Sequence, residues 1–118
     1  MFTELYRYLK IKGFDVYSIG QHEGICVSPY LVIKENGESD IAGTSYINDL
    51  VEILVYYPIG KYSSLSIYTD KLKSEMKSYK KLKRVIDPMP IIIDDDKKAY
   101  MTSYTYKKIK VKEGRLNG

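Results

Sequence analysis

The side chains from which most chemical sites are built are scarce in this sequence. Its 118 residues include one cysteine, Cys26, one histidine, His22, and no tryptophan. A single cysteine cannot close a disulfide within the chain, and one cysteine with one histidine cannot supply a zinc site. No apolar run approaches the roughly 20 residues that a bilayer-spanning helix needs. We therefore expect no disulfide scaffold, no metal, no cofactor and no membrane partner.

The first residues also lack the features of a secretory signal. Glu4 interrupts a segment in which polar and apolar residues alternate, and neither an apolar core nor a small-residue cleavage site follows. The length suits one hydrophobic core, since chains of roughly 100 to 150 residues usually form one domain. We expect a single domain over residues 1–113 and a flexible tail over 114–118.

Charge is present in quantity and is unevenly distributed along the chain. Residues 1–60 carry four Lys/Arg and eight Asp/Glu, whereas residues 61–118 carry fifteen and seven. The first half is therefore net acidic and the second net basic. Such a distribution favours head-to-tail association of copies, although solvated lysines also simply keep a small domain soluble.

The first 33 residues predict one helix and two short strands. Gly13 can end a helix in the left-handed conformation, and the residues before it place one apolar stripe on that helix. The stripe consists of Phe2, Leu5, Tyr6 and Leu9. A strand is expected over 15–19, and another over 25–33 that is interrupted at Pro29, because proline has no amide for a central ladder. The pair Asn36-Gly37 then predicts a turn.

The middle of the chain predicts a central strand and the main helix. Residues 47–57 are apolar at alternate positions on both faces, which is typical of a strand covered on both sides. After Gly60, the hydroxyls of Ser63 and Ser64 are suited to cap a helix. Apolar residues then recur at steps of three and four, as in a helix that packs on a sheet. They are Leu65, Tyr68, Leu72, Met76 and Tyr79.

The last third predicts two closing strands. Pro88 and Pro90 cannot continue the helix, and strands over 91–93 and 100–111 flank a polar connection. Along the second of these strands the apolar positions change parity, which predicts a bulge or a strand end near Lys107-Lys108. The order of elements predicts an α+β fold, with an N-terminal helix and a main helix packed on one face of a mostly antiparallel sheet.

No set of side chains has the spacing of a catalytic site, and we do not expect an enzyme. His22 lies in a polar loop without a nucleophile and is expected to be solvated. Cys26 lies between two apolar residues and is expected to be a buried thiol. The run Asp94–Asp96 offers oxygens to a cation, but consecutive residues of an extended chain point alternately and no calcium-loop glycine follows. A solvated turn is therefore the better interpretation.

A basic run is the one candidate surface for a polyanion. Residues 71–84 contain seven Lys/Arg and one acidic residue, Glu75. Binding of bases would require aromatic side chains between the charges, yet Tyr68 and Tyr79 lie on the stripe assigned to the core. We therefore expect an exposed helix face and no specific nucleic-acid partner.

Two segments carry a resemblance to a known family. They are Ser-Pro-Tyr-Leu-Val-Ile-Lys-Glu-Asn-Gly over residues 28–37, and Val-Glu-Ile-Leu-Val-Tyr-Tyr-Pro-Ile over 51–59, which leads into Ser63-Ser64-Leu65 and a lysine-rich helix. Together they resemble the tail-terminator and tail-completion proteins of tailed bacteriophages, in element order and length over nearly the whole chain. The lysine- and tyrosine-rich composition is similar to that of proteins from low-GC Gram-positive bacteria. The resemblance therefore implies a prophage or a phage-tail-like bacteriocin of such a host.

The resemblance implies a structural role without covalent chemistry. Family members form a homo-hexameric ring that caps the tail tube and meets the neck, collar or head-completion protein. The implied partners are thus other copies of the chain, a tail tube or sheath protein and a neck protein. The implied location is the tail-neck end of a virion or phage-tail-like particle, after synthesis in the bacterial cytoplasm.

Charged residues are the candidates for these contacts. We expect an acidic and a basic surface to meet between copies, and the loops over 37–46 and 94–98 to touch the ring or the tube. The candidate residues are Lys73, Lys77, Lys81, Glu38, Asp40, Asp94, Asp95 and Asp96. Charge reversal of the three lysines should weaken assembly. The alternatives are a head-completion or neck connector protein and a small basic nucleic-acid-binding protein.

Overall fold

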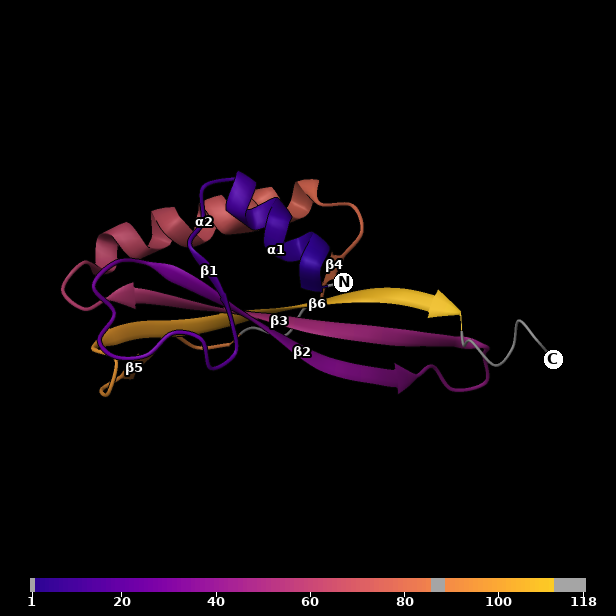
Figure 1. Ribbon diagram of the computed structural model, residues 1–118. Coiled ribbons are helices and arrows are strands. Elements are labelled where there is room, and N and C mark those ends of the chain that lie inside the picture. Colours follow the sequence, from indigo (N-terminus) through magenta and orange to yellow (C-terminus); the bar gives the residue numbers. More distant parts are fainter. Residues whose placement is uncertain (1, 86–88, 112–118) are drawn as a thin grey trace.

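A computed structural model describes residues 2–85 and 89–111 of the chain (Figure 1). The expected tail over 114–118 lies outside these residues. The elements follow the order α1 (Phe2–Ile11), β1 (Val16–Ser18), β2 (Tyr30–Asp40), β3 (Tyr46–Pro58), α2 (Tyr62–Ser78), β4 (Lys83–Arg84), β5 (Ile92–Asp94) and β6 (Ala99–Val111). The predicted first helix is confirmed, and Gly13 follows it with a φ of +95°.

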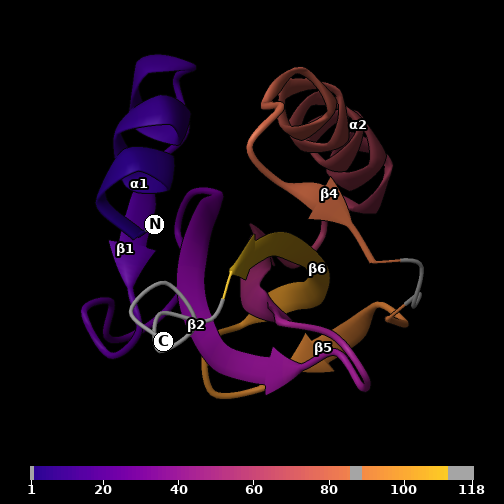
Figure 2. The same cartoon turned by 90° about the vertical axis from the view of Figure 1, so that its right-hand side faces the viewer.

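The described strands form one sheet in the order β1-β2-β3-β6-β4, and β5 also pairs with β6. β1 runs parallel to β2, whereas every other described pair is antiparallel. Both helices lie on one face of the sheet, with α1 on the side of β1 and α2 on the side of β4 (Figure 2). The predicted fold class, a mostly antiparallel α+β sheet with two helices, is confirmed.

β3 is central and carries apolar side chains on both of its faces. Val51, Ile53 and Val55 are fully buried toward the helices, where Leu5 and Leu72 pack against the same cluster. The opposite face holds a smaller cluster of Cys26, Tyr30, Val32, Tyr56 and Ala99. Each fully buried aliphatic side chain contributes roughly 1.5–3 kcal/mol, so the helix-side cluster dominates the stability.

The three long strands extend past the helices that cover them. The principal extents of the molecule are 55 × 26 × 25 Å, and the far ends of β2, β3 and β6 project beyond α1 in Figure 1. We call this projecting part, residues 34–40, 46–50 and 107–111, the sheet arm. Its edges carry the charges discussed below.

The predicted turn at Asn36-Gly37 is wrong. β2 continues through it to Asp40, and the pairing with β3 shifts register between Glu35 and Gly37. Gly37 has a φ of +84°, which suits the extra residue of a bulge as well as it suits a turn. The chain reverses only over residues 41–45, because pairing with the long β3 extends β2 beyond the glycine.

Two smaller predictions are also wrong. β6 pairs with β3 without any register shift from Ala99 to Val111, so there is neither a bulge nor a strand end near Lys107-Lys108. The change of parity arises because no helix covers the arm, and its strands need no apolar face there. The residue before α2 is Lys61, and no side chain caps this end. Ser63 and Ser64 lie inside the first turn.

Candidate functional site

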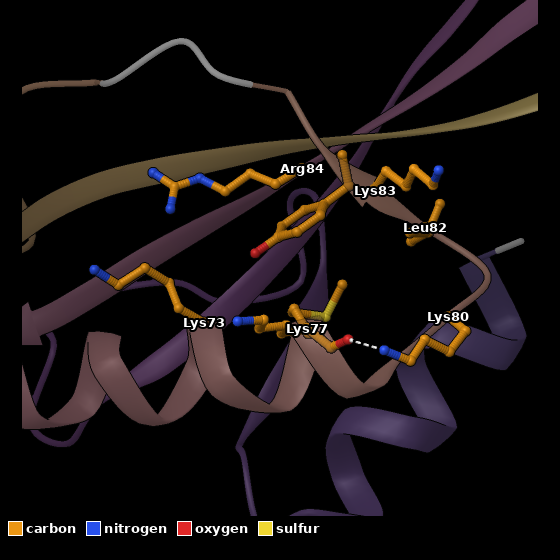
Figure 3. A pocket seen from close by; sticks show the side chains of 8 residues that line it. Lys73, Lys77, Lys80, Leu82, Lys83 and Arg84 are labelled. Carbon is orange, nitrogen blue, oxygen red and sulfur yellow. Dashed lines mark hydrogen bonds between the residues drawn. The ribbon is translucent and has the colours of Figure 1, made fainter.

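A groove opens between α2 and the strands β4 and β6, and it encloses about 400 Å³ (Figure 3). Five of its side chains are cationic and three are apolar or aromatic. They are Lys73, Met76, Lys77, Lys80, Leu82, Lys83, Arg84 and Tyr106. We call it the basic groove.

The floor of the basic groove is apolar. Met76, Leu82 and Tyr106 are at most 5% exposed, and they come from α2, the following segment and β6. Burial raises the pKa of the Tyr106 phenol to about 12, so its hydroxyl remains protonated at neutral pH. The floor therefore presents hydrocarbon and a neutral ring.

The rim of the basic groove is cationic. In Figure 3 Lys73 and Lys77 extend from α2 and Arg84 extends from β4 toward the same end of the groove, whereas the ammonium of Lys83 points the other way. The Arg84 guanidinium lies 4.9 Å from the centre of the Tyr104 ring, and Lys73 Nζ pairs with Asp70 at 3.5 Å. No carboxylate is among the described residues that line the groove. Its net charge is therefore strongly positive.

No strand of the described residues pairs with the outer edge of β4 beside the groove. Its register pairs Lys83 with Lys107 and Arg84 with Tyr106, and the Val85 N–H donates to the Thr105 carbonyl at 2.8 Å. Hydrogen-bonded and non-bonded pairs alternate in an antiparallel ladder. The N–H and C=O of Arg84 therefore point away from β6, toward the outside of the sheet.

The two sides of the sheet carry opposite charge. Past Ile33, the outer edge of β2 pairs with no described strand, and three exposed carboxylates follow it. We call Glu35, Glu38 and Asp40 the acidic flank. On the other side, Lys107 and Lys108 of β6 adjoin the basic groove. We call these two lysines the basic flank.

The predicted contact residues fall into three places. Lys73 and Lys77 line the basic groove, whereas Lys81 lies beyond α2 and donates a hydrogen bond to the Glu4 carboxylate of α1. That bond and the charge of Lys81 lower the pKa of Glu4. Glu38 and Asp40 lie on β2, so their placement in a loop over 37–46 is wrong, for the reason given for Gly37.

The three consecutive aspartates lie at the connection between β5 and β6. Asp94 ends β5, and its Oδ1 accepts a hydrogen bond from the Lys97 N–H at 3.1 Å. Asp95 and Asp96 are exposed in the turn that follows. The residues form a polar turn, as the sequence predicted.

The prediction for His22 is wrong, whereas that for Cys26 is confirmed. The His22 ring is half-buried and stacks on Tyr30 with 3.8 Å between ring centroids. Cys26 is buried, and its Sγ–H donates to the Ser28 carbonyl at 3.2 Å. Burial raises the pKa of this thiol, which disfavours the reactive thiolate.

Exposed apolar side chains gather at the end opposite the arm. The Cys26 N–H donates to the Lys97 carbonyl at 2.7 Å and the Ile59 N–H to the Lys98 carbonyl at 3.2 Å, so two distant loops meet the β5–β6 turn. The exposed residues beside these contacts are Ile25, Val27, Ile59, Ile92 and Ile93, each at least 42% exposed. We call them the apolar end.

The comparisons with known proteins add no relative: no family model, no curated protein and no solved structure matches this chain. Within residues 2–85 and 89–111, no three His, Cys, Asp or Glu side chains come together as metal ligands would. Neither described helix has the length and apolar character to cross a membrane.

Proposed function

We propose that this protein is a structural tail-terminator, or tail-completion, protein of a tailed bacteriophage or phage-tail-like particle. In this proposal, copies form a hexameric ring that caps the tail tube at its neck end. The observation that supports the proposal most is the presence of an acidic and a basic flank on opposite sides of one sheet. Such a subunit is complementary to its own copies.

Opposite flanks favour a head-to-tail contact in particular. A heterologous contact, in which one surface meets a different one, closes into a ring when the rotation per subunit divides a full turn. Exposed ion pairs contribute only about 0.2–1 kcal/mol each, so charge alone gives weak and salt-sensitive association. Such weak association between copies would be sufficient for a ring that is completed on the tube.

The apolar end provides a second, chemically different surface for the tube or neck protein. Val27 is 84% exposed and Ile93 55% exposed, although both belong to residue types that are usually buried. A lateral contact through charge and an axial contact through apolar side chains would let one small domain meet both kinds of neighbour.

A small basic nucleic-acid-binding protein is the second candidate, because the cations of the basic groove suit a polyanion. Its affinity for DNA or RNA would fall steeply with salt concentration. The apolar floor and the covered tyrosine rings favour it less, since single-stranded nucleic acid is usually bound by stacking on exposed aromatic side chains.

The ring is tested by exchanging the charge of one flank at a time. Glu35→Lys with Glu38→Lys makes both flanks basic, and Lys107→Glu with Lys108→Glu reverses the β6 side. Sedimentation velocity at low ionic strength and high protein concentration should show a hexamer for the wild type and monomers for each variant alone. An equimolar mixture should recover the hexamer, because the two variants can alternate around an even-numbered ring.

Arg7→Glu with Lys61→Glu provides the matched control, since both residues are exposed and lie on neither flank. This variant has the same net charge as the variant reversed on β6 and should assemble like the wild type. Circular dichroism establishes that each variant is folded. Association of the single-flank variants at wild-type strength, or no recovery in the mixture, would contradict the proposal.

A further inference from the structure

We infer that the basic groove binds an extended acidic peptide segment of a partner protein, in which an apolar side chain is flanked by carboxylates. This assignment does not depend on ring formation, because every residue that it uses lies within one copy of the chain. It rests on the floor, the rim and the open strand edge of the groove.

The floor selects for an apolar side chain. Met76, Leu82 and Tyr106 are buried and lie beneath an opening of about 400 Å³, which accommodates a branched aliphatic side chain with space to spare. Removing such a side chain from water is favourable, whereas a free phosphate or sulfate ion would gain nothing from this floor. The ligand therefore needs hydrocarbon as well as charge.

The rim selects for carboxylates on both sides of that side chain. Lys77 extends from α2 and Arg84 from β4, so cations stand on both walls. Neither of these two cations has an ion-pair partner among the described residues. Acidic residues before and after the apolar residue of a peptide would meet the two walls.

The open edge of β4 suits an extended backbone. Because Lys83 and Val85 direct their hydrogen-bonding groups to β6, Arg84 presents one N–H and one C=O outward beside the groove. Peptides commonly bind by adding a strand to such an edge, with side chains filling neighbouring pockets. An extended peptide supplies one C=O and one N–H at the spacing of this edge.

The aromatic rings near the groove also favour a peptide over a nucleic acid. Tyr106 is 3% exposed, and the Tyr104 ring is approached by Arg84 at 4.9 Å and by Lys73 at 5.9 Å. Neither ring is open for a base to stack on it, which is the usual source of affinity for single strands.

The test measures binding of a fluorescein-labelled peptide, Gly-Glu-Asp-Ile-Glu-Asp-Gly, by fluorescence anisotropy with the monomeric protein. One reference peptide replaces Ile by Ser, and a second replaces the four acids by their amides. Saturable binding of the first peptide is expected, with at least fivefold weaker binding of each reference. Lys77→Glu with Arg84→Glu should weaken binding roughly tenfold or more, as expected for two reversed contacts.

Lys61→Glu with Lys98→Glu changes the net charge equally and should leave the affinity unchanged. The inference is overturned if the acidic peptide does not bind, if both double variants lose affinity equally, or if the serine peptide binds as tightly as the isoleucine peptide. It is also overturned if unlabelled oligothymidylate binds more tightly and displaces the peptide, because the groove would then be a nucleic-acid surface. The ring test uses other residues, so either proposal can fail alone.

Discussion

At the scale of single residues, buried tyrosines differ in whether their hydroxyl has a partner. The Tyr8 hydroxyl donates to the Glu75 carbonyl at 2.9 Å and ties α1 to α2. Tyr30 is 1% exposed, and its ring stacks on His22 and on Tyr56, yet its hydroxyl has no hydrogen-bond partner among the described residues. A buried polar group without a partner costs free energy, whereas a paired one makes a modest net contribution.

The first prediction compares the removal of these two hydroxyls. Tyr8→Phe should lower the free energy of unfolding by about 1 kcal/mol, because it removes the bond to the Glu75 carbonyl, which then keeps only the Tyr79 N–H. Tyr30→Phe should be neutral or raise it by up to about 1 kcal/mol, since the ring stack is retained. Urea denaturation followed by circular dichroism measures both. A loss in Tyr30→Phe as large as that in Tyr8→Phe would show that the hydroxyl is paired.

At the scale of the elements, the bulge in β2 depends on the conformation of one glycine. Gly37 has a φ of +84°, and a Cβ added there would meet no atom within 4 Å. Any cost of substitution must therefore come from the backbone and not from crowding. Gly37→Ala should lower the free energy of unfolding by roughly 1–2 kcal/mol, and Gly37→Asn by less, because asparagine tolerates positive φ.

The measurement is thermal and urea unfolding of both variants beside the wild type. Equal stability of the alanine variant would mean that the strand can pass this point without the bulge. A larger loss for asparagine than for alanine would contradict a backbone origin, since asparagine is the bulkier side chain but the better one at positive φ.

Local patterns in the sequence predicted the helices and the central strand, because burial on one or two faces repeats with a fixed period. Asn36-Gly37 was ambiguous, since a turn and a bulge both require a glycine at positive φ. β4 could not be predicted, because two residues carry no period and their pairing depends on β6. The groove was missed for the same reason: Leu82 and Tyr106 meet only in the folded sheet.

At the scale of the whole molecule, the order of the strands in the sheet places an acidic segment of the chain and a basic segment on different sides of one surface. β3 separates β2 from β6, so the acidic flank and the basic flank lie on opposite sides of the sheet. The sequence predicted the charge difference but not its direction in space.

The buried tyrosines determine how the stability of the whole fold responds to alkaline pH. Burial raises the pKa of tyrosines in both clusters and on α2, because the phenolate is poorly solvated there. They are Tyr30, Tyr56, Tyr68, Tyr79 and Tyr106. The unfolded chain releases these protons near pH 10, before the folded chain does. The stabilisation is therefore complete below pH 10 and is lost as the pH rises toward the folded values.

The last prediction is cooperative alkaline unfolding. The free energy of unfolding should fall above about pH 10, by about 1.4 kcal/mol per pH unit for each tyrosine that ionises only in the unfolded chain. Circular dichroism and phenolate absorbance should then change together. Tyr68→Phe with Tyr106→Phe should make the fall less steep, whereas Tyr62→Phe, at a residue that is 58% exposed, should not alter it. The phenolate absorbance that Tyr68→Phe with Tyr106→Phe removes reports these two rings. Its appearance near pH 10 with unchanged circular dichroism would contradict the raised pKa values, because the two tyrosines would then ionise within the folded protein.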